Sequence, residues 1–522
     1  MLILFLYPVY VAKLSPPPQR APQEIRKVTD ITAQEVPEDK PSAQIKRVNA
    51  VDTVHDTVIE NGRLWVKLSN QGARVNTIRL IRFKDVAGQD AVTICDYYSS
   101  DKGLFAGTGL FLGYDLNHTR FDYQEQKNRV DYRINLPGAF EIEKAFILEE
   151  DSNLLKVEIR IKNLQDKPLP VALDFISAGG MVKKEPFEER YLEIALSSPE
   201  KTQHDFLRQI RKTKEYISPV NWLALKNKYF CQVIAPQSDK ISFSAERIEN
   251  SNLETTAHLP LTMLSPRETR EERFIFYAGP LDPELLARYN PDWQRIVFYG
   301  AFDGVAKLLL RILKGGFILL KNYGLAIILL SLLVNAVLFP FTWKGMRSMQ
   351  RLQALQPEIE KLRQQYSSDP QKLNKEILEF YKKNKVNPFG GCLPMLLQMP
   401  VFISLYQALS RAIQLKGAHF LWIKDLSAPD AVLKFPAKVP FLGESLNLLP
   451  LIMVLATFLQ QKKSQTVTPA SQKQMALLMP LFLGLIFYNM PSGLILYWVT
   501  STFLTLGLQS LPFTRQPHTH VT

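Results

Sequence analysis

The chain has few cysteines and lacks the common signatures of catalysis. Its three cysteines, Cys95, Cys231 and Cys392, have neither the paired spacing of a zinc site nor the density of a disulfide scaffold. The sequence does not decide whether Cys95 and Cys231 form a disulfide bridge. The sequence contains no G-x-x-x-x-G-K-[ST] phosphate loop, metalloprotease helix motif or nucleophile elbow. We therefore expect no enzyme, no catalytic residues, no metal site and no cofactor.

Polar and apolar residues are unevenly distributed along the 522 residues. The 63 Lys and Arg exceed the 50 Asp and Glu, which gives a net charge of +13. Residues 20–295 are polar and strand-like, whereas residues 297–513 hold five apolar runs that no soluble core would need. At about 150 residues per domain, this length predicts two to four folding units. The pattern predicts a membrane protein with a large water-soluble domain.

The first residues are apolar but form a short run. Residues 1–12, at 1.5 Å per residue, would reach only about 18 Å as a helix, less than the ~30 Å of a hydrocarbon core. A basic region typical of a signal peptide is lacking, so either the natural start lies upstream or this is the trailing half of a signal anchor. We favour the second and interpret residues 1–13 as a truncated or partial transmembrane anchor. Residues 14–48, rich in Pro, Gln and charge, predict a disordered linker.

Residues 49–291 alternate between apolar and polar side chains. In the segment 155–161, Val157 and Ile159 share one face and Glu158 and Arg160 the other, which is typical of a half-buried strand. Similar runs occur at residues 64–68, 77–83, 140–148, 229–234 and 273–278. We predict an all-β antiparallel sandwich, favoured here as a structural or docking module. A sugar-binding or catalytic site is the alternative, because the fold alone does not assign chemistry.

The membrane half begins with an amphipathic segment. In residues 292–321, Lys307, Arg311 and Lys314 recur at i, i+4 and i+7 between apolar residues. This predicts an interfacial helix that lies along the membrane surface with its cations toward the headgroups.

Five apolar runs follow, and we predict a five-helix transmembrane core over residues 322–513. The expected spans are residues 325–343, 392–409, 446–459, 475–490 and 494–511. Most are short for an average bilayer, so we expect local thinning. Residues 343–386 carry ten Lys and Arg against five acids, and residues 460–474 three against none. The positive-inside rule then places both loops and the short tail 514–522 in the cytoplasm, and the β domain outside.

The long basic loop, residues 344–386, is itself patterned. Two apolar stripes flank a helix-breaking segment at residues 367–370, which predicts a cytoplasmic helical hairpin. It is either a solvated charged hairpin or a docking element for a polyanionic or nascent-chain partner.

The membrane half contains four distinctive motifs: NPFGGCLP at residues 387–394, LQMPVF at 397–402, WIKDLS at 422–427 and MPSGLILYW at 490–498. With these motifs the chain resembles the YidC family of bacterial membrane-protein insertases, which has relatives in mitochondria and chloroplasts. The β domain resembles the family's periplasmic domain more loosely. The resemblance implies an insertase and chaperone of the inner membrane that works on nascent membrane proteins in the lipid bilayer. It also implies the ribosome and a Sec-type translocon as candidate partners.

The resemblance further implies a water-filled groove, open to the cytoplasm and to lipid, that normally carries one arginine. Here that position holds Asn335, so we expect a neutral polar groove. The expected lining residues are Ser331, Asn335, Gln398, Gln407, Thr457, Thr500 and Thr502, and the resemblance adds Tyr497 and Trp498 as client contacts. Interhelical hydrogen bonding for the polar residues, and interfacial anchoring for the aromatic pair, are the alternatives. Structural roles are expected for Pro340, Gly390, Gly391, Pro394, Pro400, Pro491 and Gly493.

Two other functions stay open. A solute channel or lipid flippase with a β-sandwich sensor is disfavoured because the expected spans contain no Lys or Arg for ion coupling and no internal repeat. Carbohydrate binding by the sandwich would be a further role on the outer face.

Overall fold

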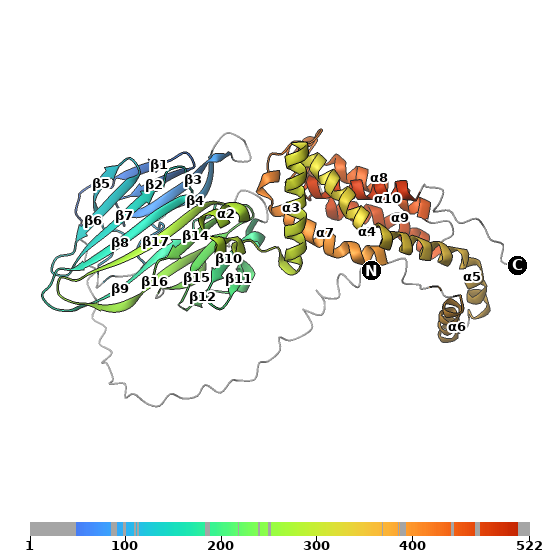
Figure 1. The fold of residues 1–522 in the computed structure, drawn as a ribbon, viewed down its shortest axis with the longest axis horizontal. Coiled ribbons are helices and arrows are strands. Elements are labelled where there is room, and N and C mark those ends of the chain that lie inside the picture. The colour runs from blue at the N-terminus through green and yellow to red at the C-terminus, as the bar shows by residue number, and fades with distance from the viewer. Residues whose placement is uncertain are drawn as a thin grey trace, which may run out of the picture. The chain divides into compact units, whose positions relative to one another are not determined.

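The computed structural model describes most of residues 49–509 (Figure 1). The described part excludes residues 85–90, 98–100, 109–110, 112–113, 183–187, 218, 239–240, 249–251, 368, 385, 387–392, 440–442 and 465–469. The expected anchor, linker and tail, together with Gly390 and Gly391, lie outside the described residues.

The first half forms three antiparallel sheets, as the alternating pattern predicts. The first sheet contains, in order, β1 (Asp56–Glu60), β2 (Leu64–Ser69), β3 (Arg74–Lys84) and β4 (Ala91–Asp96). The second contains β11 (Thr202–Phe206), β10 (Glu193–Ser197), β13 (Trp222–Lys226), β14 (Phe230–Pro236), β17 (Thr269–Pro280), β8 (Leu154–Asn163), β7 (Phe140–Leu148), β6 (Arg129–Asn135) and β5 (Asp122–Gln126). The third contains β12 (Thr213–Tyr216), β15 (Ser242–Ile248), β16 (Asn252–Leu264) and β9 (Leu169–Ala178).

An aromatic cluster shows how the sheets pack. The ring of Phe105 lies 5.8 Å from Phe146 of β7, 5.7 Å from Phe276 of β17 and 5.4 Å from Phe175 of β9. Since β7 and β17 belong to the second sheet and β9 to the third, the two sheets share one buried apolar layer. Cys95 and Cys231 are both buried and free, so the bridge left open by the sequence is not formed.

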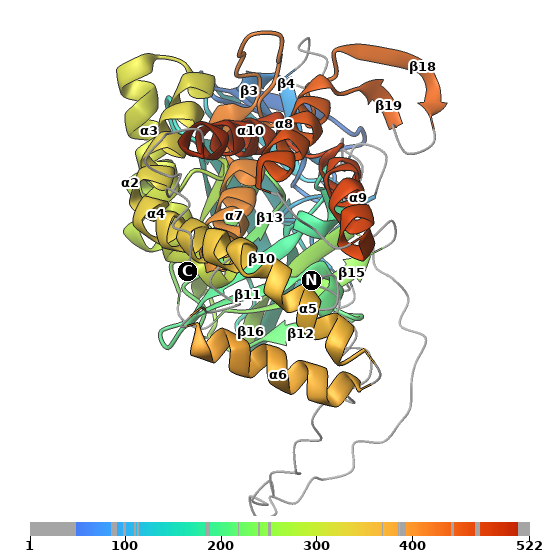
Figure 2. The same cartoon turned by 90° about the vertical axis from the view of Figure 1, so that its right-hand side faces the viewer.

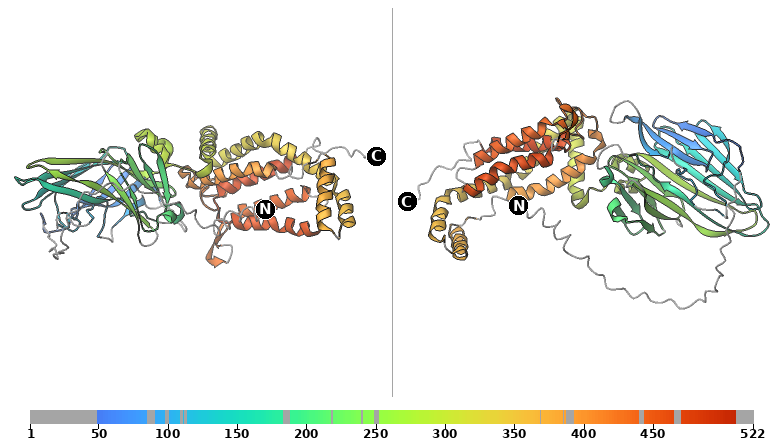
Figure 3. Two further views of the ribbon diagram at one scale, coloured as in Figure 1. Left: turned by 90° about the horizontal axis from the view of Figure 1, so that it is seen from below. Right: turned by 180° about the vertical axis from the view of Figure 1, so that it is seen from behind.

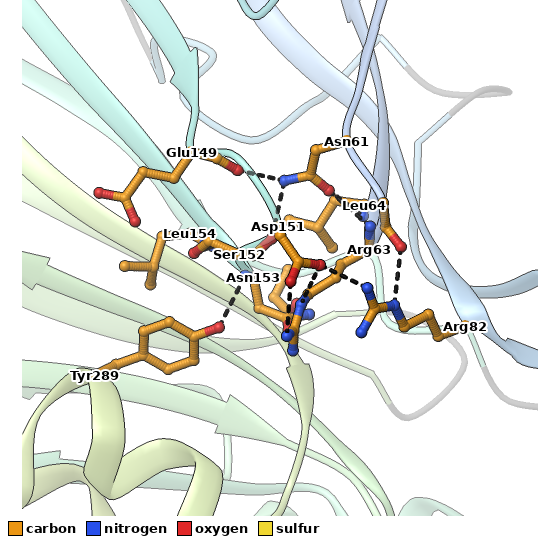
Figure 4. A network of polar contacts seen from close by, with 12 residues as sticks. Asn61, Arg63, Leu64, Arg82, Glu149, Asp151, Ser152, Asn153, Leu154 and Tyr289 are labelled. Atoms are coloured by element: carbon orange, nitrogen blue, oxygen red, sulfur yellow. Dashed lines mark hydrogen bonds and ion pairs between the residues drawn. The ribbon is translucent and has the colours of Figure 1, made fainter.

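A polar network joins the first sheet to the turn between β7 and β8 (Figure 4). The Asn61 side chain donates to the carbonyl oxygens of Glu149 and Ser152, and its own oxygen accepts from the backbone N–H of Leu64. Asp151, in the same turn, accepts hydrogen bonds from Arg63 and Arg82. These contacts fix the edge of the first sheet against the second.

The second half is helical (Figures 1 and 3). Short elements lead into it: α2 (Pro283–Tyr289) and the 3-10 turns η4 (Pro291–Ile296) and η5 (Gly300–Phe302). The long helices are α3 (Asp303–Leu320), α4 (Tyr323–Ala354), α7 (Leu393–Arg411), α8 (Leu448–Ser464), α9 (Ala470–Phe487) and α10 (Ser492–Leu508). Between α4 and α7 lie α5 (Gln356–Gln365) and α6 (Pro370–Lys383), and between α7 and α8 lie the strands β18 (Leu433–Val439) and β19 (Gly443–Leu446).

Each apolar run expected to span the membrane coincides with a helix, although the bounds differ by several residues. Among the residues that the structure describes, one helical segment, Tyr323–Leu352, is long and apolar enough to cross a bilayer. Shorter apolar helical segments occur at Leu448–Lys462, Leu478–Phe487 and Ser492–Leu508.

The loop expected to form a hairpin contains two helices that pack on each other, α5 and α6. The Asp369 side chain accepts from the backbone N–H groups of Gln371 and Lys372 and so caps α6. The hairpin begins later than the sequence suggests, because α4 continues to Ala354 before the chain turns.

Candidate functional site

A chain of hydrogen bonds links three helices of the second half. The Gln398 side-chain amide on α7 donates to the Tyr497 hydroxyl on α10 at 2.7 Å. The backbone carbonyl of Tyr497 accepts from the Ser331 hydroxyl on α4 at 3.4 Å. Asn335, one turn further along α4, donates to the Ser331 carbonyl at 2.7 Å and accepts from the Ser501 hydroxyl at 3.1 Å. We call these five residues the polar chain.

Four of the five residues of the polar chain lie on neighbouring turns of two packed helices, α4 and α10. Ser331 and Asn335 are four residues apart on α4, and Tyr497 and Ser501 four apart on α10, so each pair shares one face of its helix. Ser331 and Tyr497 are fully buried, whereas Asn335, Gln398 and Ser501 are half-exposed. The polar chain therefore runs from the helix interface to an accessible surface, and all five of its side chains are neutral.

Other expected lining residues are held differently. The hydroxyls of Thr457 and Thr500 donate to the carbonyl oxygens of Met453 and Leu496, one turn back on their own helices. Gln407 is half-buried on α7, and Thr502 is buried on α10. The structure thus brings Ser331, Asn335, Gln398 and Tyr497 together with Ser501 and does not place the threonine hydroxyls in the same network.

The two expected client-contact aromatics have different surroundings. Tyr497 is fully buried. Trp498 is half-buried, and its ring centroid lies 5.1 Å from that of Phe402 on α7 and 5.3 Å from that of Phe487 on α9. Trp498 therefore belongs to an aromatic cluster that joins three helices, and the Tyr497 ring lies inside the helix packing.

The expected structural residues occupy special backbone positions. Pro340 and Pro400 lie inside α4 and α7, and Pro394 is the second residue of α7. Pro491 directly precedes α10. A Cβ added at Gly493 would lie 3.0 Å from the Leu426 carbonyl oxygen, which already accepts from the Gly493 N–H at 2.9 Å. The glycine allows this close approach.

The cations of the amphipathic helix have mixed surroundings. Lys307 pairs with Asp303 at 2.7 Å, and Lys314 pairs with Glu284 of α2 at 2.9 Å, whereas Arg311 is exposed. Two of the three cations expected to face headgroups thus have protein carboxylates beside them.

Comparison with known proteins identifies the family. The family described as "YidC periplasmic domain" matches residues 56–312, and the one described as "60Kd inner membrane protein" matches residues 316–518. A "Membrane protein insertase YidC" from Syntrophobacter fumaroxidans is 34% identical over 395 residues, covering 74% of this chain and 71% of the relative. The chain belongs to the YidC family. It is a membrane protein insertase of the bacterial inner membrane with a β-rich periplasmic domain, and its clients are nascent membrane proteins.

Two further similarities extend along most of the chain. A YidC insertase from Pelobacter propionicus is 28% identical over 484 residues, covering 90% of this chain and 89% of the relative. A crystal structure of an active YidC insertase with its first transmembrane domain resolved covers 90% of this chain and 95% of its own, with 18% identity and a TM-score of 0.39.

Ser501, which completes the polar chain, was not among the residues expected from the sequence. A signal was present, because Ser501 follows Tyr497 by four residues and so shares its helix face. The close contact at Gly324, where an added Cβ would lie 2.1 Å from the Phe420 ring, was not expected from the sequence either. The periodic pattern of α4 carries no sign of that contact, because Phe420 is distant in sequence.

Proposed function

We propose that the half-exposed end of the polar chain, at Asn335, lines a neutral hydrophilic groove that receives the polar tails of client membrane proteins. The observation that carries the proposal is Asn335 itself, a polar and half-exposed side chain on the one helix of the described residues that is long and apolar enough to cross a bilayer. Polar groups at membrane depth are costly when they face lipid, so such a position favours a hydrated surface.

In this mechanism the groove shortens the apolar barrier that a polar tail must cross. Burial of the client's own apolar segment, about 20 residues, supplies the driving force. The short helices support a shortened barrier, because the 17 residues of α8 reach only about 25 Å. The mechanism uses no chemical step, and we propose that the protein is not an enzyme.

The proposed topology has five spans, formed by α4, α7, α8, α9 and α10, with the C-terminus in the cytoplasm. The Lys and Arg of residues 343–386, and those of residues 460–474 at the end of α8 and the start of α9, support this orientation by the positive-inside rule.

The neutral groove has a consequence for client choice. Asn335 can hydrate a tail and hydrogen-bond to it, but it exerts no net-charge attraction on an acidic tail. We expect this insertase to favour clients with neutral or weakly charged tails.

The test compares Asn335→Leu and Asn335→Arg in depletion and rescue, with two clients that differ only in the charge of the tail. Leu should lower insertion of both clients several-fold, and Arg should raise insertion of the acidic-tail client. Ala336→Leu is the matched control, because Ala336 is exposed on the adjacent position of α4 and gains the same apolar side chain. Equal insertion by Asn335→Leu and the unaltered protein would reject the groove at this position.

Photocrosslinking from position 335 during translation of a small client tests the same proposal directly. Crosslinks to the client tail support it. Flux of ions or lipids through client-free liposomes containing the protein would instead favour a channel or flippase.

The hairpin of α5 and α6 is our candidate for ribosome contact. Four lysines, Lys372, Lys375, Lys382 and Lys383, lie on α6, and cations attract the phosphates of RNA with an affinity that falls as salt rises. Charge reversal at Lys382 and Lys383 should weaken co-sedimentation with ribosomes at low salt. The resemblance also supports action either alone or with a Sec-type translocon.

A further inference from the structure

The segment between α7 and α8 exposes large apolar side chains at two places, a tight turn at residues 421–422 and the start of β18 at residues 432–433. Leu421 is 76% exposed and Leu433 is 59% exposed, and Trp422 and Val432 beside them are exposed as well. A group of exposed apolar residues of this size commonly marks a contact surface. We call these four residues the apolar rim.

Hydrogen bonds to one buried carboxylate, that of Asp430, hold these two places together. The Trp422 indole N–H donates to Asp430 Oδ2 at 3.1 Å. The same oxygen accepts from the backbone N–H groups of Leu448 and Leu449 at 3.0 and 2.9 Å. The apolar rim is therefore fixed to the first turn of α8. Because the single N–H of the indole is satisfied, the exposed surface of Trp422 is apolar in character.

The backbone of Leu421 supports a role for its exposed side chain. Its φ of +52° is in the left-handed region, which is unfavourable for a leucine. Paired backbone hydrogen bonds between Phe420 and Ile423, both 2.9 Å, close the turn around it. The fold thus holds a strained leucine outward at the tip of a tight turn.

The hairpin of β18 and β19 leaves the helices sideways. Figure 2 shows β18 and β19 extending laterally beyond α8, and the left view of Figure 3 shows the same orange hairpin leaving across the length of the helices. A hairpin with this direction, attached at the start of α8, would follow the membrane surface rather than rise away from it.

We propose that the apolar rim binds the outer leaflet of the lipid bilayer and sets the depth of α8 in the membrane. Leu421, Trp422 and Leu433 enter the boundary between headgroups and acyl chains, where tryptophan is favoured. The exposed Lys424 and Lys434 lie beside the rim in sequence and meet lipid phosphates. The proposal rests on the proposed function, in which α4 and α8 cross the membrane and the segment between α7 and α8 lies on its outer side.

The test measures the depth of spin labels in the full chain, reconstituted in vesicles of phosphatidylethanolamine and phosphatidylglycerol. Cys392→Ser leaves Cys95 and Cys231, which are buried thiols. Single labels are placed by Leu421→Cys and Leu433→Cys. The matched controls are Val337→Cys, 72% exposed on α4, and Leu261→Cys, 71% exposed on β16.

For each label we compare its collisions with oxygen and its collisions with a water-soluble nickel chelate, as a ratio. This ratio should be several-fold higher for labels at Leu421, Leu433 and Val337 than for the label at Leu261. Ratios at 421 and 433 that match position 261 would overturn lipid binding while the label at 337 still reports lipid. Labels at 421 and 433 that reach neither reagent would show a protein partner and would also overturn it. A water-like label at 337 would overturn both this inference and the proposed spans.

Discussion

The Ser501 hydroxyl donates to the Oδ1 atom of Asn335 at 3.1 Å and thereby joins α10 to α4. Both side chains are half-exposed, so water can replace either partner if the groove is wet. The effect of replacing one member of this pair therefore shows whether water reaches the proposed site.

Replacing Ser501 distinguishes a wet from a dry site. With Ser501→Ala, water should take over the hydrogen bond to Asn335, and stability should fall by less than about 1 kcal/mol with insertion retained. Thermal unfolding in detergent and an insertion assay measure the two effects. Thr500→Val is the control, since the Thr500 hydroxyl bonds to the Leu496 carbonyl of its own helix. A loss of insertion as large as that of Asn335→Leu would indicate a dry interhelical bond.

Lys144 should make the stability of the β domain depend on pH. Its ammonium group is buried and donates to the carbonyl oxygens of Gly72 and Phe105 at 2.9 and 2.7 Å, and of Ala73 at 3.4 Å. Burial, with the nearby Arg74, lowers the pKa of Lys144 from 10.5 to about 7. Between those two pH values the unfolded chain binds more protons at this site than the folded chain, so the contribution of Lys144 to stability rises with pH.

The variant Lys144→Met should remove this contribution and leave three carbonyl groups without their donor. The difference in unfolding midpoint between the unaltered protein and the variant should therefore widen from pH 7 toward pH 10. Far-ultraviolet circular dichroism of the detergent-solubilised chain follows the β signal. A difference that stays constant over this range would contradict the lowered pKa.

Two glycines at the start of the membrane half should respond oppositely to alanine. A Cβ at Gly324 would lie 2.1 Å from the Phe420 Cγ, so Gly324→Ala should destabilise the protein by about 1–3 kcal/mol. Gly315, inside α3, has nothing within 4 Å of its added Cβ. Gly315→Ala should therefore stabilise by about 1 kcal/mol through helix propensity. Thermal unfolding followed by the helical signal compares them, and equal effects would argue against the close approach of α4 to Phe420.

The network at the edge of the first sheet should depend on Asn61 more than on Asp151 (Figure 4). The Asn61 side chain satisfies carbonyls of Glu149 and Ser152, so Asn61→Ala should cost about 1–3 kcal/mol. The Asp151 side chain is 63% exposed, and solvent screens its pairs with arginine. Asp151→Asn, which tolerates the local φ of +44°, should leave the unfolding midpoint almost unchanged. The reverse order of the two midpoints would refute this ranking.

Much of the fold followed from periodicity. The alternation around Val157 and Ile159 predicted β8, and the apolar runs predicted the positions of α4 and α10, because burial imposes a period on each element. Helix bounds were less accurate: α3 begins at Asp303 rather than near residue 292, since η4 and η5 occupy the intervening residues.

The sequence by itself determined the family, through its motifs, and the neutral residue at position 335. Only the tertiary structure decided which polar residues act together. Thr457 and Thr500 satisfy their hydroxyls on their own helices, whereas Ser501 reaches Asn335 across a helix interface. A hydroxyl can bond within its helix or to a neighbour, and the choice depends on the distance and rotation between packed helices, which local sequence does not encode.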